Sequence, residues 1–146
     1  KLHEELARDM IQNVTVKRNN KDLATTLNRI KEIRERYKNI SLDDNVSNLN
    51  QTYIFANQFN SMLELAMIIT KGALLRDEFR GSHFKPEFPE RDDKNWMKTT
   101  IAAYDPKSDE PNITYESIDT PYLKPIQRDY TKAKRIKPKL ENIPQI

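Results

Sequence analysis

Apolar residues recur every three or four positions through the first half of the chain, which places them on one face of an α-helix. A short helix is predicted first, because Leu2, Leu6 and Met10 are spaced four residues apart and Ile11 and Val14 lie close to the same face. A helix with one such stripe buries that stripe against other elements.

A second helix is predicted after a break at residues 17–20, and its pattern is the most regular in the sequence. Its apolar positions follow one another at steps of four, three, three, four and three residues: Leu23, Leu27, Ile30, Ile33, Tyr37 and Ile40. Asn20 is a candidate N-cap, and Asp22 would lie in the first turn, where the helix dipole favours a negative charge.

The longest helix is predicted from about Asn48 to about Phe79. It follows a turn at residues 41–47, in which Ser41 and Asp44 have the spacing of a capping box. One face carries an apolar or small residue at nearly every turn: Leu49, Tyr53, Ala56, Phe59 or Asn60, Leu63, Ala66 and Thr70. Three helices joined by short turns imply an up-down-up three-helix bundle over residues 1–83, and hence a mainly α fold.

The second part of the chain must be built differently, because all eight prolines lie between residues 86 and 144. Residues 85–93 predict a loop, and the runs 97–104 and 113–118 favour a β-hairpin with a turn between them. We expect this loop and hairpin, residues 84–120, to pack on the bundle. The remainder, residues 121–146, is predicted to be an extended arm with seven basic and two acidic residues.

The four residues 80–83 at the predicted end of the long helix are the most distinctive cluster. Gly81 is expected to end the helix in a left-handed conformation, with Arg80 near the negative end of the dipole and His83 as a capping group. A structural role is the main interpretation. A second is an interface role, in which Arg80 and His83 hold a neighbouring domain by charge-assisted hydrogen bonds.

The composition of this chain excludes several kinds of chemical site. It has no cysteine, which excludes thiolate metal ligands, cysteine nucleophiles and cysteine-held iron–sulfur clusters. It has only two glycines, so the glycine-rich turn that holds a dinucleotide is missing, and only two histidines, His3 and His83, far apart in sequence. We therefore expect no catalytic, cofactor-binding or metal-binding residue here.

Three segments together resemble the C-terminal region of succinate dehydrogenase and fumarate reductase flavoproteins: residues 63–66 (LELA), 76–83 (RDEFRGSH) and 88–96 (FPERDDKNW). The family pattern is a long helix ending in Glu-Ser-Arg-Gly-Ala-His, followed by a charged loop and a Trp. Phe79 stands where the pattern has Ser, and Ser82 where it has Ala. The resemblance extends over about residues 1–131.

The resemblance implies a spectrin-repeat-like three-helix bundle followed by a small hairpin. It also implies a whole enzyme that oxidises succinate to fumarate with FAD and passes electrons to an iron–sulfur subunit and quinone. Membrane anchor subunits complete the complex, which is expected to be cytoplasmic and peripheral on the inner face of the cell membrane. The fragment alone is expected to be inactive and to pack on the flavin-binding domain of its own subunit. The interface positions it suggests are Arg80, Gly81, His83, Asp92 and Trp96.

Other functions remain open from the sequence. L-aspartate oxidase and adenylylsulfate reductase share the architecture that the resemblance implies. A stand-alone helical interaction module is a further alternative, because the apolar face of the long helix is wide enough to bind another helix. Nucleic-acid binding has only weak support, because the net charge is +3 and the basic excess falls on the tail.

Overall fold

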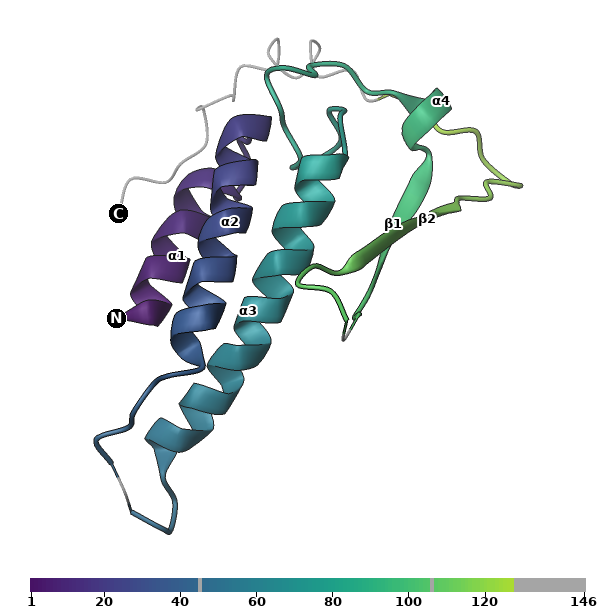
Figure 1. The fold of residues 1–146 in the computed structure, drawn as a ribbon. Coiled ribbons are helices and arrows are strands. Elements are labelled where there is room, and N and C mark those ends of the chain that lie inside the picture. The colour runs from purple at the N-terminus through teal and green to yellow at the C-terminus, as the bar shows by residue number, and fades with distance from the viewer. Residues whose placement is uncertain (45, 106, 128–146) are drawn as a thin grey trace, which may run out of the picture.

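The computed structural model describes residues 1–44, 46–105 and 107–127. Its elements are α1 (Leu2–Asn13), α2 (Asn20–Tyr37), α3 (Gln51–Leu75), a short α4 (Asp93–Trp96), β1 (Lys98–Ala103) and β2 (Asn112–Ser117). The first three helices run up, down and up beside one another, and the hairpin lies beside α3 with its tip reaching α2 (Figure 1). The predicted mainly α fold with a following hairpin is confirmed.

The core forms where the apolar stripes of the three helices meet. Its centre is built from side chains that are almost completely removed from water: Leu6, Leu27, Ile30, Ile33, Phe59, Leu63, Ala66 and Met67. A second, smaller cluster near the other end joins Val14, Leu23 and Ala73. Each fully buried leucine or isoleucine contributes roughly 1.5–3 kcal/mol by leaving water, so these stripes hold the bundle together.

The starts of α2 and α3 are capped by asparagines, although not where the sequence suggested. Asn19 rather than Asn20 is the N-cap of α2, and its side chain accepts a hydrogen bond from the backbone N–H of Asp22 at 2.8 Å. Asn50 caps α3 by accepting from the N–H of Tyr53 at 2.7 Å. The predicted capping box of residues 41 and 44 is wrong, because α3 begins several residues later.

The long helix also ends earlier than predicted, at Leu75 rather than near Phe79. Arg76 leaves the helical conformation with φ −95° and ψ 103°. Its side chain donates to the Lys98 carbonyl of the hairpin, and Glu78 after it accepts from the Asp92 N–H of the charged loop. Gly81 does have a left-handed φ of 59°, but it lies in a tight turn beyond the helix rather than at its C-terminus.

The hairpin forms as predicted, with β1 and β2 antiparallel and Lys98 opposite Ser117 at one end and Ala103 opposite Asn112 at the other. A two-stranded sheet is marginal by itself, so its attachment to the bundle matters. In the part of the chain that the structure describes, no helix combines the length and apolar character required to cross a bilayer. The predicted arm lies outside the described residues from position 128 onward.

Candidate functional site

The residues singled out from the sequence gather at one end of the bundle, around the C-terminus of α3. The α1–α2 connection reaches this end through two backbone hydrogen bonds, from the N–H of Phe84 to the Val16 carbonyl at 3.1 Å and from the N–H of Arg18 to the Phe84 carbonyl at 2.9 Å. The loop that follows α3 thus lies between α1, α2 and the hairpin (Figure 1).

A buried carboxylate, Glu78, lies at the centre of this region with a side chain that is 0% exposed. It accepts hydrogen bonds from Arg76 at 2.6 Å and from Arg80 at 2.8 and 2.9 Å. The backbone N–H of Asp92 donates a further bond at 3.3 Å. Burial of a charge is tolerated when it is paired and hydrogen-bonded in this way.

Arg80 therefore has partners within its own chain. Besides Glu78 it contacts Asp93 at 2.7 Å, and Arg91 holds the same carboxylate at 2.6 Å. Hydrogen bonds from Arg91 and then Arg80 lower the pKa of Asp93 to about 2. The side chain of Arg80 remains 30% exposed, so part of it still faces the surface.

His83 is nearly buried and is held at both ring nitrogens. Its Nδ1 lies 2.6 Å from a guanidinium nitrogen of Arg18, and its Nε2 lies 2.8 Å from the backbone carbonyl of Arg76. A guanidinium can only donate and a carbonyl can only accept, so the two contacts require the neutral ring with its hydrogen on Nε2. Burial, and then the nearby cation of Arg18, lower the pKa of His83 below its usual value.

The capping role predicted for His83 is thus present, because the carbonyl it binds belongs to the residue that ends α3. Gly81 allows His83 to approach the Arg76 carbonyl. It occupies the first central position of a two-residue turn in which Arg80 and His83 exchange backbone hydrogen bonds of 3.0 Å in both directions. Such a turn requires positive φ at that position, which glycine adopts without strain.

Asp92 and Trp96 frame the short helix α4. The carboxylate of Asp92 accepts from the backbone N–H of Asn95 at 3.0 Å and so caps α4, and the side chain of Asn95 is the main cause of a lowered pKa for Asp92. The Trp96 ring lies under the guanidinium of Arg76, 5.1 Å from its centre, and meets the Tyr115 ring edge-on at 5.6 Å. Trp96 thus links the end of α3 to the hairpin.

Two residues of this region were missed from the sequence, Glu78 and Lys85. The Lys85 side chain is 0% exposed, and its Nζ donates to the Leu74 carbonyl and to Asp77, both at 2.9 Å. It satisfies a carbonyl at the end of α3, which otherwise lacks a partner. No periodic signal marks either residue, because their burial depends on where the loop returns to the helix.

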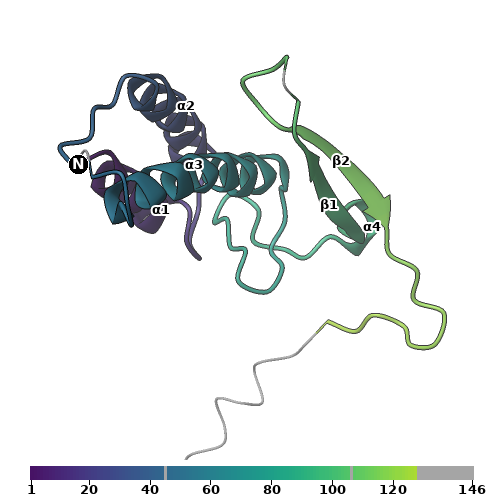
Figure 2. The same cartoon turned by 90° about the horizontal axis from the view of Figure 1, so that it is seen from below.

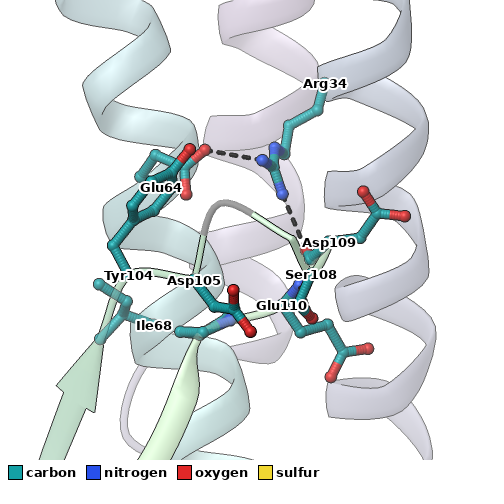
Figure 3. A pocket seen from close by; sticks show the side chains of 9 residues that line it. Arg34, Glu64, Ile68, Tyr104, Asp105, Ser108, Asp109 and Glu110 are labelled. Carbon is teal, nitrogen blue, oxygen red and sulfur yellow. Dashed lines mark hydrogen bonds and ion pairs between the residues drawn. The ribbon is translucent and has the colours of Figure 1, made fainter.

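A separate small hollow lies where the tip of the hairpin meets α2 and α3 (Figure 3). Its volume is about 80 Å³, and Arg34 beside it is bound to Glu64 at 2.9 Å and to the Asp109 carbonyl at 2.8 Å. Lys71 reaches Glu110 at 2.9 Å, and Lys31 contacts the same carboxylate. These ion pairs attach the hairpin to the bundle, and the hollow is far smaller than a dinucleotide.

The arrangement defines a class of protein: a helical domain with a hairpin attached to its long helix, whose charged groups brace the domain internally. The family model described as "Fumarate reductase flavoprotein C-term" matches residues 3–130, and the chain belongs to this family. The resemblance inferred from residues 63–96 is therefore confirmed.

Relatives of known function carry the same region. The succinate dehydrogenase flavoprotein subunit of Bacillus subtilis is 44% identical over 133 residues, which are 91% of this chain and 23% of that protein. The fumarate reductase flavoprotein subunit of Helicobacter pylori is 37% identical over 81% of this chain and 17% of that protein. The chain thus spans less than a quarter of the length of these relatives.

Solved structures show the same fold. The Sdh1 complex of Mycobacterium smegmatis in the apo form contains a chain with a TM-score of 0.69 and 26% identity, matched over 79% of this chain and 19% of that one. The quinol fumarate reductase of E. coli gives a TM-score of 0.82 at 24% identity, over 86% of this chain and 22% of that one. This chain corresponds to the C-terminal domain of such flavoprotein subunits.

Proposed function

We propose that this chain serves as a non-catalytic, bracing domain of a flavoprotein subunit whose whole polypeptide interconverts succinate and fumarate with FAD. The observation that carries the proposal is the 44% identity to a succinate dehydrogenase flavoprotein over 91% of this chain. Relatives named as succinate dehydrogenase and as fumarate reductase both match, so the proposal covers the reaction in either direction.

The residues of this chain do not form a turn that could bind the dinucleotide FAD. Gly72 lies inside α3, and Gly81 lies in the tight turn after it. Neither follows a strand and opens a helix, which is where a dinucleotide-binding turn places its glycines. We therefore assign FAD to another part of the polypeptide, and we derive no chemical step from this chain.

The proposed role of the cluster at the end of α3 is to present a fixed surface to neighbouring parts of the enzyme. Arg80, Gly81, Asp92 and Trp96 would form this interface, and the nearly buried His83 would hold the turn behind them. The internal contacts of Glu78 and Lys85 support the proposal, because they fix the backbone on which the exposed part of Arg80 is carried. The neighbours would be the flavin-binding domain of the same subunit, an iron–sulfur subunit and a membrane anchor.

A comparison of two polypeptides tests this function. The whole flavoprotein that contains this sequence is expected to show flavin absorbance and succinate-dependent dye reduction, and the 146-residue chain neither. Replacement of Arg80 by Ala in the whole protein should weaken assembly with the iron–sulfur subunit or the flavin content, while Glu35→Ala on the outer face of α2 should change neither. Turnover by the 146-residue chain alone would overturn the proposal.

A further inference from the structure

The helix α3 differs from its neighbours in how few charges it carries. Only Glu64 and Lys71 are charged among its 25 residues, whereas α1 carries four charged residues in 12 and α2 eight in 18. Both charges of α3 lie on the side of α2 and the hairpin tip, because Glu64 binds Arg34 and Lys71 binds Glu110, each at 2.9 Å. The rest of the α3 surface is neutral.

Part of that neutral surface is apolar and open to solvent. We call it the α3 stripe and define it as Ile54, Phe55, Met62, Leu65 and Ile69, which fall within about 100° of the helix circumference. Four of these residues are 44–58% exposed, and Met62 is partly buried at the margin of the core. The stripe extends for most of the length of α3.

The α3 stripe contrasts with the other outer faces of the bundle. The exposed sides of α1 and α2 are joined by ion pairs that suit water, such as Glu5 with Arg36 at 2.6 Å and with Arg29 at 3.4 Å. Figure 2 shows α3 between the α1–α2 pair and the hairpin, as the central helix of the domain. Among residues 54–69, Gln58 is the one exposed polar residue within the arc of the helix that the stripe covers. A helix that carries an exposed apolar stripe beside its buried one is typical of the interior of a larger protein.

We infer that the α3 stripe is covered by the flavin-binding part of the same polypeptide, through a neutral apolar surface on that part. This inference rests on the proposed function. The relatives are more than four times longer than the region they share with this chain, and the family model describes their C-terminus. Most of their length therefore precedes the matched domain and is present in the same molecule.

The position of the first residues of α1 also favours the flavin-binding part as the partner that covers the stripe. His3, in the first turn of α1, lies with its ring 5.3 Å from Phe55 of the stripe and 5.9 Å from Phe59. In the longer relatives, the polypeptide that precedes the matched domain would join it beside this end of the stripe. Tethering at that point gives it a high effective concentration over the stripe, which a separate subunit or a second copy lacks.

Cysteine labelling of the whole flavoprotein tests the inference, since this chain has no cysteine of its own. Three single variants are compared: Leu65→Cys in the stripe, Leu63→Cys in the buried core, and Glu35→Cys on the exposed side of α2. Maleimide labelling at each position is followed by mass spectrometry of the peptide that contains it. Leu65→Cys is expected to react at least about tenfold more slowly than Glu35→Cys, as Leu63→Cys does.

Measurements on the same samples distinguish a failure of this inference from a failure of the proposed function on which it rests. Flavin absorbance with a Leu65→Cys that labels as fast as Glu35→Cys would overturn the inference and leave the proposed function standing. Protection that appears only after the other subunits are added, or that disappears on dilution, would also overturn it, in favour of a partner subunit or a second copy. Absence of flavin from the whole protein would refute the function itself.

Discussion

Glu78 is the residue on which the charged cluster depends, because two guanidinium groups and a backbone N–H converge on its carboxylate. Glu78→Gln keeps the shape of the side chain but removes its charge, and it leaves Arg76, only 14% exposed, without an anion. We expect a loss of about 3 kcal/mol in the free energy of unfolding, measured with urea.

A matched control for Glu78 exists on the surface of α2. Glu35 pairs with Lys38, and both side chains are more than 60% exposed. Glu35→Gln should therefore change the free energy of unfolding by less than about 0.5 kcal/mol. Equal effects of the two substitutions would show that the buried carboxylate contributes no more than a solvated one.

His83 should make stability depend on pH in a predictable direction. Burial of the ring, and then the cations of Arg18, Lys85 and Arg76, hold the pKa of His83 below 6.5 in the folded chain. The unfolded chain therefore binds a proton first as pH falls. The contribution of the neutral ring is complete above about pH 6.5 and is lost as pH falls from there to the lower pKa of the folded state.

The measurement for His83 is the free energy of unfolding at several pH values between 5 and 8, for the natural chain and for His83→Gln. The amide of Gln can donate and accept but does not titrate in this range. We expect the difference between the two proteins to narrow as pH falls. Glu5 and Asp93, whose pKa values are about 2, lose their contribution only at more acidic pH, so they do not obscure the result. Parallel pH profiles would contradict the lowered pKa and hence the neutral state of the ring in the folded chain.

At the scale of elements, the two glycines give opposite predictions. Gly81 has a φ of 59°, and a Cβ there would meet nothing within 4 Å, so Gly81→Ala costs only backbone strain, about 1 kcal/mol. Gly72 lies within α3, and a Cβ there would meet Thr100 at an ordinary 3.8 Å. Gly72→Ala should raise stability by about 0.5–1 kcal/mol, because alanine is the better helix former. Thermal unfolding of both variants checks the signs, and a shift of the same sign in both would refute the argument.

Elements with a local cause were predictable from the sequence. The regular apolar steps from Leu23 to Tyr37 define α2, and the strand-forming residues of the runs 97–104 and 113–118 define the hairpin. Boundaries fixed by distant contacts were not. The prediction that the long helix extends to Phe79 assumed that Gly81 ends it, whereas Arg76 in the structure turns away to bind the Lys98 carbonyl at 2.6 Å.

The candidate site follows the same division. Gly81 and His83 could be identified from the local motif, and the structure places both at a turn beside the end of α3. The buried Lys85 could not, because a lysine in a loop is expected to be solvated until the loop is seen to fold back on the Leu74 carbonyl. Motifs therefore located the region, and tertiary contacts determined which charges are buried in it.

At the scale of the whole molecule, the same substitution should have different effects in two contexts. Ile69 is 49% exposed in this domain, so Ile69→Lys in the 146-residue chain should change the free energy of unfolding by less than about 0.5 kcal/mol. In the whole flavoprotein the new ammonium would lie between two apolar surfaces without a partner. Its desolvation should then lower stability by about 2 kcal/mol or more.

Asn28→Lys, on the exposed side of α2, adds the same charge outside the α3 stripe and serves as the control. It should be tolerated in both polypeptides, because its ammonium stays in water. Urea midpoints of the two variants in both contexts provide the measurement. The decisive quantity is the extra loss caused by Ile69→Lys in the longer protein. If that loss is zero, the apolar face of α3 faces solvent in the whole enzyme, and the low charge of the helix needs another explanation.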